Sequence, residues 1–229
     1  MYTKGDLMYK AVIFDLDGTL VNSLEDLAIS TNYALNFYGF PTHETEKYKY
    51  FVGDGMLKLI ERVLPEENRD SETKVKVFDA FINYYSQHYL DKTIAYDGIH
   101  NVLDELKKMG IKIAVVSNKA DKMAKIVVEK IFGDIFDFVV GKRDGYPTKP
   151  DPKLTLEVID ILGVKPDDCA FVGDSGMDMA AAKNSGCLAV GVLWGFRERQ
   201  ELQQNGADYL LENTDEITEL VRKCNKWMQ

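Results

Sequence analysis

Short apolar runs recur along the chain, and each ends at Gly, Asp, Ser or Asn before a segment with helical spacing. This alternation predicts parallel strands joined by helices. The expected strands are residues 10–14, 111–116, 136–140, 169–172 and 187–192, with 207–211 as a weaker sixth. Because the runs are apolar almost throughout, helices should cover both faces of the sheet. The pattern therefore predicts an α/β fold with a doubly wound, Rossmann-like parallel sheet, whose ligands bind at the carboxyl ends of the strands.

The first connection is much longer than the others. About 75 residues separate the end of the first strand region near Leu20 from Tyr96, beyond the usual length of a crossover. Within it, helical spacing recurs over residues 24–38, 51–64 and 75–90. We therefore predict a mostly helical cap domain, residues 22–95, inserted into an α/β core made of residues 1–21 and 96–229.

Composition narrows the class of protein. The 229 residues are 45% hydrophobic and 28% charged, which is ordinary for a globular protein. A net charge of −9 has the wrong sign for a nucleic-acid binder. No run approaches the ~18 apolar residues of a membrane helix, and the N-terminal residues lack a secretory pattern. We expect a cytoplasmic protein with reduced cysteines, either a monomer or a homodimer, with no nucleic-acid or membrane partner.

Two acidic residues, Asp15 and Asp17, directly follow the first predicted strand, and Gly18 comes next. Like charges held this close raise each other's pKa unless a cation compensates them. Oxygen ligands of this kind suit Mg²⁺, which is bound by one or two carboxylates together with waters and substrate phosphate. An isolated Asp-x-Asp-Gly is more often a simple turn. Its position after a buried strand favours a magnesium site here.

Other polar groups follow later strands. Asp174 and Asp178 come after the strand at 169–172, Ser117 and Asn118 close the run at 111–116, and Lys149 lies in a Pro-rich loop. A cap, a solvated charge or a helix N-terminus would explain each group separately. Because the carboxyl ends of parallel strands lie at one edge of a sheet, the groups are expected to converge there, where hydroxyl, amide and ammonium groups can bind phosphate.

Taken together and in this order, the segments resemble the haloacid dehalogenase superfamily of phosphohydrolases. The four matching signatures are Asp15-Leu-Asp17-Gly-Thr19, Ser117-Asn118, Lys149-Pro150 and Gly173-Asp174-Ser175-Gly-Met-Asp178. The acid at Asp17 distinguishes the phosphatases of the superfamily from its dehalogenases, which lack an acid at that place.

The resemblance implies a role for each matching residue. Asp15 would be the nucleophile that forms an aspartyl phosphate, Asp17 the general acid and base, and Lys149 a catalytic positive charge. Mg²⁺ would be held by the side chains of Asp15 and Asp174 and by the main-chain carbonyl of Asp17, with Asp178 in support. The expected phosphate-binding groups are Thr19, Ser117 and Asn118.

An insertion at this place marks superfamily members with a helical cap, which carries substrate selectivity. The turn Val-Gly53-Asp-Gly55 is similar to one in phosphoglycolate phosphatases, so Gly53 is a candidate substrate contact, although a plain helix–helix turn explains it nearly as well. We therefore expect a Mg²⁺-dependent phosphatase for a small phosphomonoester. A pyrophosphatase, a 5′-nucleotidase, a phosphosugar mutase and a non-enzymatic phosphate-binding regulator stay open as alternatives.

Overall fold

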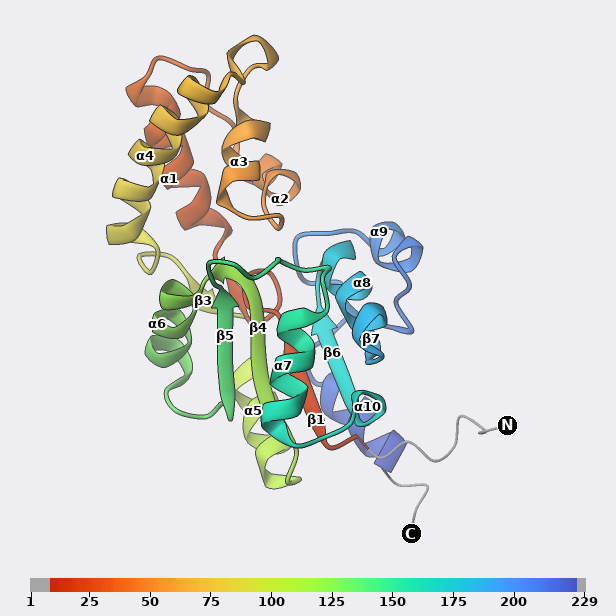
Figure 1. Ribbon diagram of the computed structural model, residues 1–229. Coiled ribbons are helices and arrows are strands. Elements are labelled where there is room, and N and C mark those ends of the chain that lie inside the picture. Colours follow the sequence, from red (N-terminus) through yellow and green to blue (C-terminus); the bar gives the residue numbers. More distant parts are fainter. Residues whose placement is uncertain (1–8, 226–229) are drawn as a thin grey trace. The chain divides into compact units, whose positions relative to one another are not determined.

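The computed structural model describes residues 9–225, which divide into two compact units (Figure 1). We call one the core unit, which comprises Met1–Leu20 and Ala95–Gln229, and the other the insert unit, Val21–Ile94. The chain therefore leaves the core unit after its first strand and returns to it about 75 residues later.

The core unit contains a six-stranded sheet in the order β5-β4-β1-β6-β7-β8, and each neighbouring pair is parallel. The strands are β1 (Ala11–Phe14), β4 (Lys112–Ala120), β5 (Phe138–Lys142), β6 (Cys169–Gly173), β7 (Leu188–Val192) and β8 (Tyr209–Leu211). This confirms the predicted doubly wound sheet. The strand β4 runs four residues further than its apolar run predicts, because its pairing with β5 resumes at Ala120 after an irregularity.

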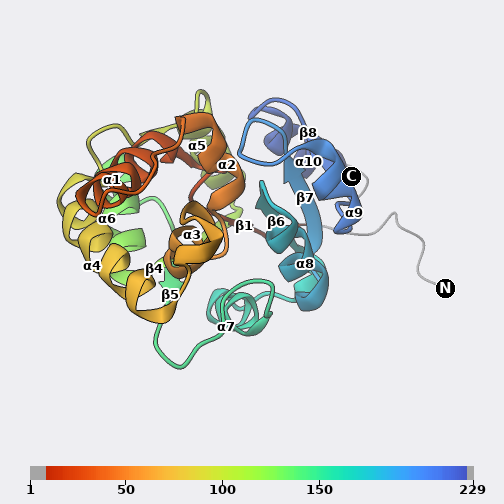
Figure 2. The same cartoon turned by 90° about the horizontal axis from the view of Figure 1, so that it is seen from above.

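Helices cover both faces of this sheet (Figures 1 and 2). They are α5 (Ile99–Lys108), α6 (Asp121–Phe132), α7 (Lys153–Leu162), α8 (Gly176–Ser185), α9 (Arg199–Gln204) and α10 (Glu216–Asn225). The helices α7 and α8 pack on one face, whereas α5 and α10 pack against each other on the opposite face. The glycines after residues 99–109 and 154–162 end α5 and α7 as expected, with positive φ at Gly110 and Gly163.

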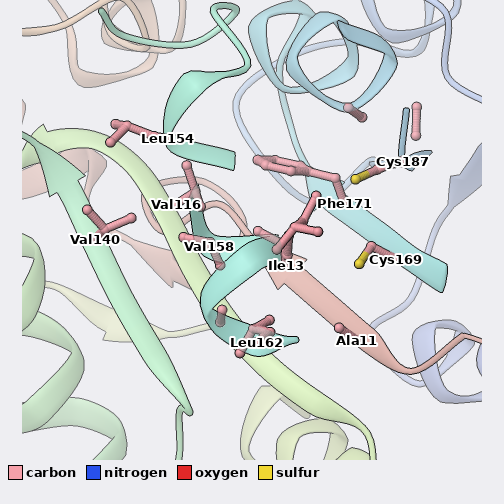
Figure 3. Close-up of a cluster of buried hydrophobic side chains, with 14 of the residues drawn as sticks. Ala11, Ile13, Val116, Val140, Leu154, Val158, Leu162, Cys169, Phe171 and Cys187 are labelled. Atoms are coloured by element: carbon pink, nitrogen blue, oxygen red, sulfur yellow. The ribbon is translucent and has the colours of Figure 1, made fainter. Parts of the chain in front are cut away.

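The apolar core on the α7 side draws on alternate residues of the central strands (Figure 3). Ile13, Val116 and Phe171 point toward Val158 of α7, and all four side chains are buried. Burying one such side chain stabilises the fold by about 1.5–3 kcal/mol. This packing fixes the positions of β1, β4 and β6, whose carboxyl ends carry the polar residues singled out above.

The insert unit is mostly helical. It contains α1 (Leu24–Phe37), α2 (Tyr48–Phe51), α3 (Met56–Val63) and α4 (Ser71–His88), and α1 packs along α4. A two-stranded sheet of β2 (Val21–Asn22) and β3 (Ile94–Ala95) joins the segments by which the chain enters and leaves. The prediction of one helix over 51–64 is wrong, because Gly53 and Gly55 adopt φ of 107° and 90° and separate α2 from α3.

Short 3-10 helices lie at Thr45–Lys47, Glu66–Asn68 and Pro166–Asp168. Among the helices of residues 9–225, none is both long enough and apolar enough to cross a membrane. The three cysteines Cys169, Cys187 and Cys224 are free thiols.

Candidate active site

Asp15 lies at the carboxyl end of β1, the strand at which the chain order reverses between β4 and β6. Its backbone N–H donates to the Val172 carbonyl at 2.9 Å, so β6 holds the first residue after the strand in place. Gly18 then turns the chain with φ of 89°. A Cβ at Gly18 would overlap the Asp174 carboxylate. Glycine is therefore required for the close approach of the two acidic segments.

Lys149 joins two of the predicted acids. Its Nζ lies 2.6 Å from Asp15 Oδ1 and 2.6 Å from Asp178 Oδ1. Lys149 is only 3% exposed, and Asp178 is fully buried. The backbone N–H of Lys149 donates to Asn118 Oδ1 at 2.9 Å, which fixes the lysine loop to the end of β4. Three signatures that are far apart in the sequence therefore meet around one ammonium group.

The carboxylate of Asp178 is occupied by partners within the protein. Its Oδ2 accepts from the Ser175 N–H at 3.0 Å and the Ser175 hydroxyl at 2.6 Å, at the N-terminus of α8, while Oδ1 accepts from Lys149. A Cβ at Gly173 would overlap this side chain. These contacts fit Asp178 better to a supporting role than to direct ligation of an ion.

Asp174 is buried and held at both oxygens. The Thr19 hydroxyl donates to Oδ1 at 3.2 Å, and the Phe196 backbone N–H donates to Oδ2 at 2.8 Å. Thr19 is itself fully buried. Its side chain thus supports Asp174, and its predicted contact with a phosphate stays a prediction.

Asp17 has a partner that sequence reasoning missed. Lys119 Nζ lies 3.1 Å and 3.2 Å from the two oxygens of the Asp17 carboxylate. The Lys119 side chain is 2% exposed, and its backbone N–H donates to the Ser117 hydroxyl at 3.2 Å. Its place directly after Ser117-Asn118 at a strand end is the signal that could have identified it.

Burial dominates the electrostatics of these groups. Desolvation raises the pKa of Asp15 to about 7, and Asp178 and Asp17 add to this rise although the Lys149 ammonium opposes it. Desolvation, followed by the charges of Asp178 and Asp15, raises the pKa of Asp174 well above its usual range. For Lys149 the two neighbouring carboxylates outweigh burial and raise the pKa. The Lys149 ammonium therefore stays charged, whereas the carboxylates of Asp15 and Asp174 have too little positive charge nearby to offset the effect of burial on their pKa values.

The donor set fits a divalent cation. Carboxylate oxygens of Asp15, Asp174 and Asp178 lie within 4.8 Å of one another, and oxygen donors are the ligands that Mg²⁺ prefers. Desolvation and the charges of neighbouring carboxylates raise the pKa values of Asp15 and Asp174, and a bound cation would relieve this repulsion. Asp15 and Asp174 are better placed than Asp178 to bind it, because Asp178 accepts two hydrogen bonds at Oδ2 and the Lys149 ammonium at Oδ1, whereas Asp174 accepts one neutral donor at each oxygen.

The core unit thus brings together most of the residues that the sequence singled out. Ser117 is 2% exposed at the end of β4, beside Asn118. Gly53 belongs to the insert unit, and its predicted substrate contact stays a prediction. In that unit the neighbouring Asp54 forms an ion pair with Arg62.

Comparison with known proteins identifies the family of the chain. The sequence model of one protein family, the haloacid dehalogenase-like hydrolases, matches residues 12–192 of this chain. The chain is 33% identical to the phosphoglycolate phosphatase of Chromobacterium violaceum, and the match covers 93% of this chain and 96% of that protein. It is 29% identical to the phosphoglycolate phosphatase of Aquifex aeolicus, again over 93% of this chain and 96% of that protein.

Solved structures agree as well. A crystal structure from Lactobacillus delbrueckii subsp. bulgaricus, whose assignment as a phosphoglycolate phosphatase is itself a prediction, is 32% identical with a TM-score of 0.90, over 94% of this chain and 99% of that one. Because the family model covers more than half of the chain and a relative is 33% identical along nearly the whole chain, the protein belongs to the haloacid dehalogenase-like hydrolase family.

Proposed function

We propose that this member of the family, a phosphoric monoester hydrolase, is a Mg²⁺-dependent phosphatase that cleaves a small phosphomonoester of the phosphoglycolate type through an aspartyl-phosphate intermediate. The observation that carries the proposal is the ion-paired set of Asp15, Lys149 and Asp178, with Asp174 beside it, at the carboxyl ends of β1 and β6. The substrate class is supported by the relatives, which are phosphoglycolate phosphatases that match this chain along nearly their whole length.

In the proposed reaction an oxygen of the Asp15 carboxylate attacks phosphorus in line, and the bond from phosphorus to the ester oxygen breaks. Asp17 donates a proton to the departing alkoxide. Asp17 then takes a proton from water as the water attacks the phosphorus of the aspartyl phosphate, which releases phosphate and regenerates Asp15. Splitting hydrolysis in two lowers each barrier, and proton transfer by a positioned carboxyl contributes about 10²–10⁴-fold.

Other groups of the core unit stabilise charge. Lys149, already 2.6 Å from Asp15 Oδ1, would neutralise part of the charge on the transferring phosphoryl group. Ser117 and Asn118 are proposed as hydrogen-bond donors to it. Mg²⁺, held by the side chains of Asp15 and Asp174 and the main-chain carbonyl of Asp17, would supply positive charge against the anionic substrate.

Selectivity is proposed to reside in the insert unit. We propose that residues 22–95 act as a cap and that the turn at Gly53 contributes to substrate recognition. The positive φ of Gly53 and Gly55 shows that this turn needs glycine for its backbone, so a loss of activity on substituting Gly53 must be separated from a loss of folding before it is credited to recognition.

The test is release of inorganic phosphate in the presence of Mg²⁺ from 2-phosphoglycolate, p-nitrophenyl phosphate, pyrophosphate, 5′-nucleotides and sugar phosphates. We expect 2-phosphoglycolate to give the highest kcat/KM, and Asp15→Asn to reduce turnover by at least about 10³-fold. Asp104→Asn, the same change on the exposed face of α5, is the matched control and should retain activity. The proposal fails if wild-type protein releases no phosphate from any of these compounds, or if Asp15→Asn matches the wild type.

A further inference from the structure

The loop between β7 and α9, residues 193–197, packs directly against the candidate metal ligands. Neither the predicted site nor the proposed mechanism uses this loop, and the family model ends before it, at residue 192. Phe196 is buried, and Trp194 and Gly195 are half-buried. At its start, the Leu193 N–H donates to the Leu211 carbonyl at 2.9 Å, which anchors the loop to the end of β8.

The loop reaches Asp174 in two ways. The backbone N–H of Phe196 donates to Asp174 Oδ2 at 2.8 Å, in a buried hydrogen bond. The indole Nε1 of Trp194 donates to the Thr19 carbonyl at 3.1 Å, and the hydroxyl of the same Thr19 donates to Asp174 Oδ1. The loop therefore supplies the donor to Asp174 Oδ2 itself, and it holds Thr19, which supplies the donor to Asp174 Oδ1.

Gly195 lies between these two contacts and shows how closely the loop approaches. A Cβ at Gly195 would overlap both the Asp174 side chain and the Gly18 carbonyl oxygen. Gly195 does not have a positive φ, so the requirement is for space and not for backbone conformation. The loop backbone thus touches both acidic segments, the turn after β1 and the residue after β6.

We infer that the 193–197 loop is a positioning element for the metal ligand Asp174, with Trp194 and Gly195 as its positioning residues. Groups that hold a ligating carboxylate fix the orientation of its free lone pairs, and loss of such partners typically costs about 10–100-fold in metal affinity or activity. Disturbing the loop should therefore weaken metal binding first. Turnover at saturating metal should change little, because Asp15, Asp17 and Lys149 do not contact the loop through any of these hydrogen bonds.

This inference rests on the proposed function, so the experiment separates the two. Mn²⁺ is titrated into purified protein, and the free ion is measured by its electron paramagnetic resonance signal, which gives a Kd without any turnover. Trp194→Phe keeps an aromatic ring but removes the indole N–H, and Gly195→Ala adds the methyl group that has no room. Phe196→Leu is the matched control, because it alters a loop side chain and keeps the backbone N–H that binds Asp174.

We expect Kd for Mn²⁺ to rise several-fold in Trp194→Phe and about tenfold or more in Gly195→Ala, and to stay within twofold in Phe196→Leu. The Mg²⁺ concentration for half-maximal phosphate release should rise in parallel in both variants, and kcat at saturating Mg²⁺ should be nearly unchanged in Trp194→Phe. Circular dichroism confirms folding of each variant, and Trp194→Phe decides alone if Gly195→Ala does not fold.

Equal Kd values in all four proteins would overturn the inference while leaving the proposed function intact. A rise in Phe196→Leu as large as that in Trp194→Phe would also overturn it, since loop packing and not the hydrogen bonds would then set the affinity. Failure of the wild-type protein to bind Mn²⁺ would refute the proposed metal site, and the inference with it.

Discussion

Replacing Lys149 by Met tests the electrostatics of the site most directly. The substitution keeps an unbranched side chain and removes the ammonium that lies 2.6 Å from both Asp15 and Asp178. Removing one partner of a buried ion pair typically destabilises a protein by about 3–5 kcal/mol. Asp15, whose pKa is already raised to about 7, will take up a proton at neutral pH when the ammonium is gone. We therefore expect Lys149→Met to lower the free energy of unfolding by about 3 kcal/mol at pH 7, near the lower end of this range.

The sign of the pH dependence follows from the same groups. A carboxyl whose pKa is raised in the folded state binds more protons there than in the unfolded chain, so its contribution to stability falls as pH rises. Without Lys149 the pKa of Asp15 rises further, and the difference in unfolding free energy between wild type and Lys149→Met should be larger at pH 8.5 than at pH 5.5. Activity should be lost at both pH values, because the nucleophile is protonated or unpaired.

The assay is urea unfolding without added metal, followed by tryptophan fluorescence. Trp194 is half-buried in the core unit, so its signal follows the unfolding of that unit; the second tryptophan, Trp227, lies outside the described residues. Lys107→Met is the control, since the pair of Lys107 with Asp137 is about one-third exposed and should contribute about 0–1 kcal/mol. The reasoning would be refuted if the two variants lost equal amounts of unfolding free energy, or if Lys149→Met lost less at pH 8.5 than at pH 5.5.

Three further outcomes follow from the structure. Mg²⁺ should raise the melting temperature more at pH 8 than at pH 5, because ionisation of Asp15 near pH 7 is needed for ligation; an equal shift at both pH values would contradict this assignment. The buried Asp26 carboxylate accepts from the Lys92 and Thr93 backbone N–H groups and from the Thr93 hydroxyl. Asp26→Asn should therefore destabilise the insert unit by about 1–3 kcal/mol, measured by urea unfolding followed by circular dichroism. An unchanged unfolding midpoint would show that these hydrogen bonds do not stabilise the unit. Lys119→Met should raise KM for 2-phosphoglycolate several-fold by removing a positive charge beside Asp17, and an unchanged KM would show that Lys119 does not attract the substrate.

The sequence predicts the parts of this fold that repeat a simple physical pattern. The strands β1 and β6 follow from continuous apolar runs, because a strand covered on both faces has no polar side. The ends of α5 and α7 follow from the glycines after them, because a left-handed residue after a helix favours glycine. The prediction fails over residues 51–64, where helical spacing continues across Gly53 and Gly55 but the backbone turns. Spacing alone does not report φ.

Some residues of the site can likewise be predicted from the sequence, and others cannot. The acids Asp15 and Asp174 are visible in the sequence because charged residues directly after buried strands are costly and unusual. Lys119 and the Trp194 indole are not visible in this way, because a lysine at a strand end and a tryptophan in a loop are ordinary in composition. Their importance depends on tertiary contacts with Asp17 and Thr19, which join residues more than 100 positions apart in the chain.

Charge balance connects these observations. When Asp15, Asp17, Asp174 and Asp178 are ionised, Lys149 and Lys119 compensate only two of the four charges, and one divalent cation would bring the group to neutrality. A phosphate dianion would then approach a neutral site within a chain of net charge −9, instead of one that repels it. Binding of the cation and binding of the substrate are therefore expected to be coupled: the metal lowers the electrostatic cost of the phosphate, and by linkage the phosphate raises the affinity for the metal. This coupling predicts that inorganic phosphate, a product of the proposed reaction, lowers the Kd for Mn²⁺ in the wild-type protein, and that Lys149→Met reduces the effect.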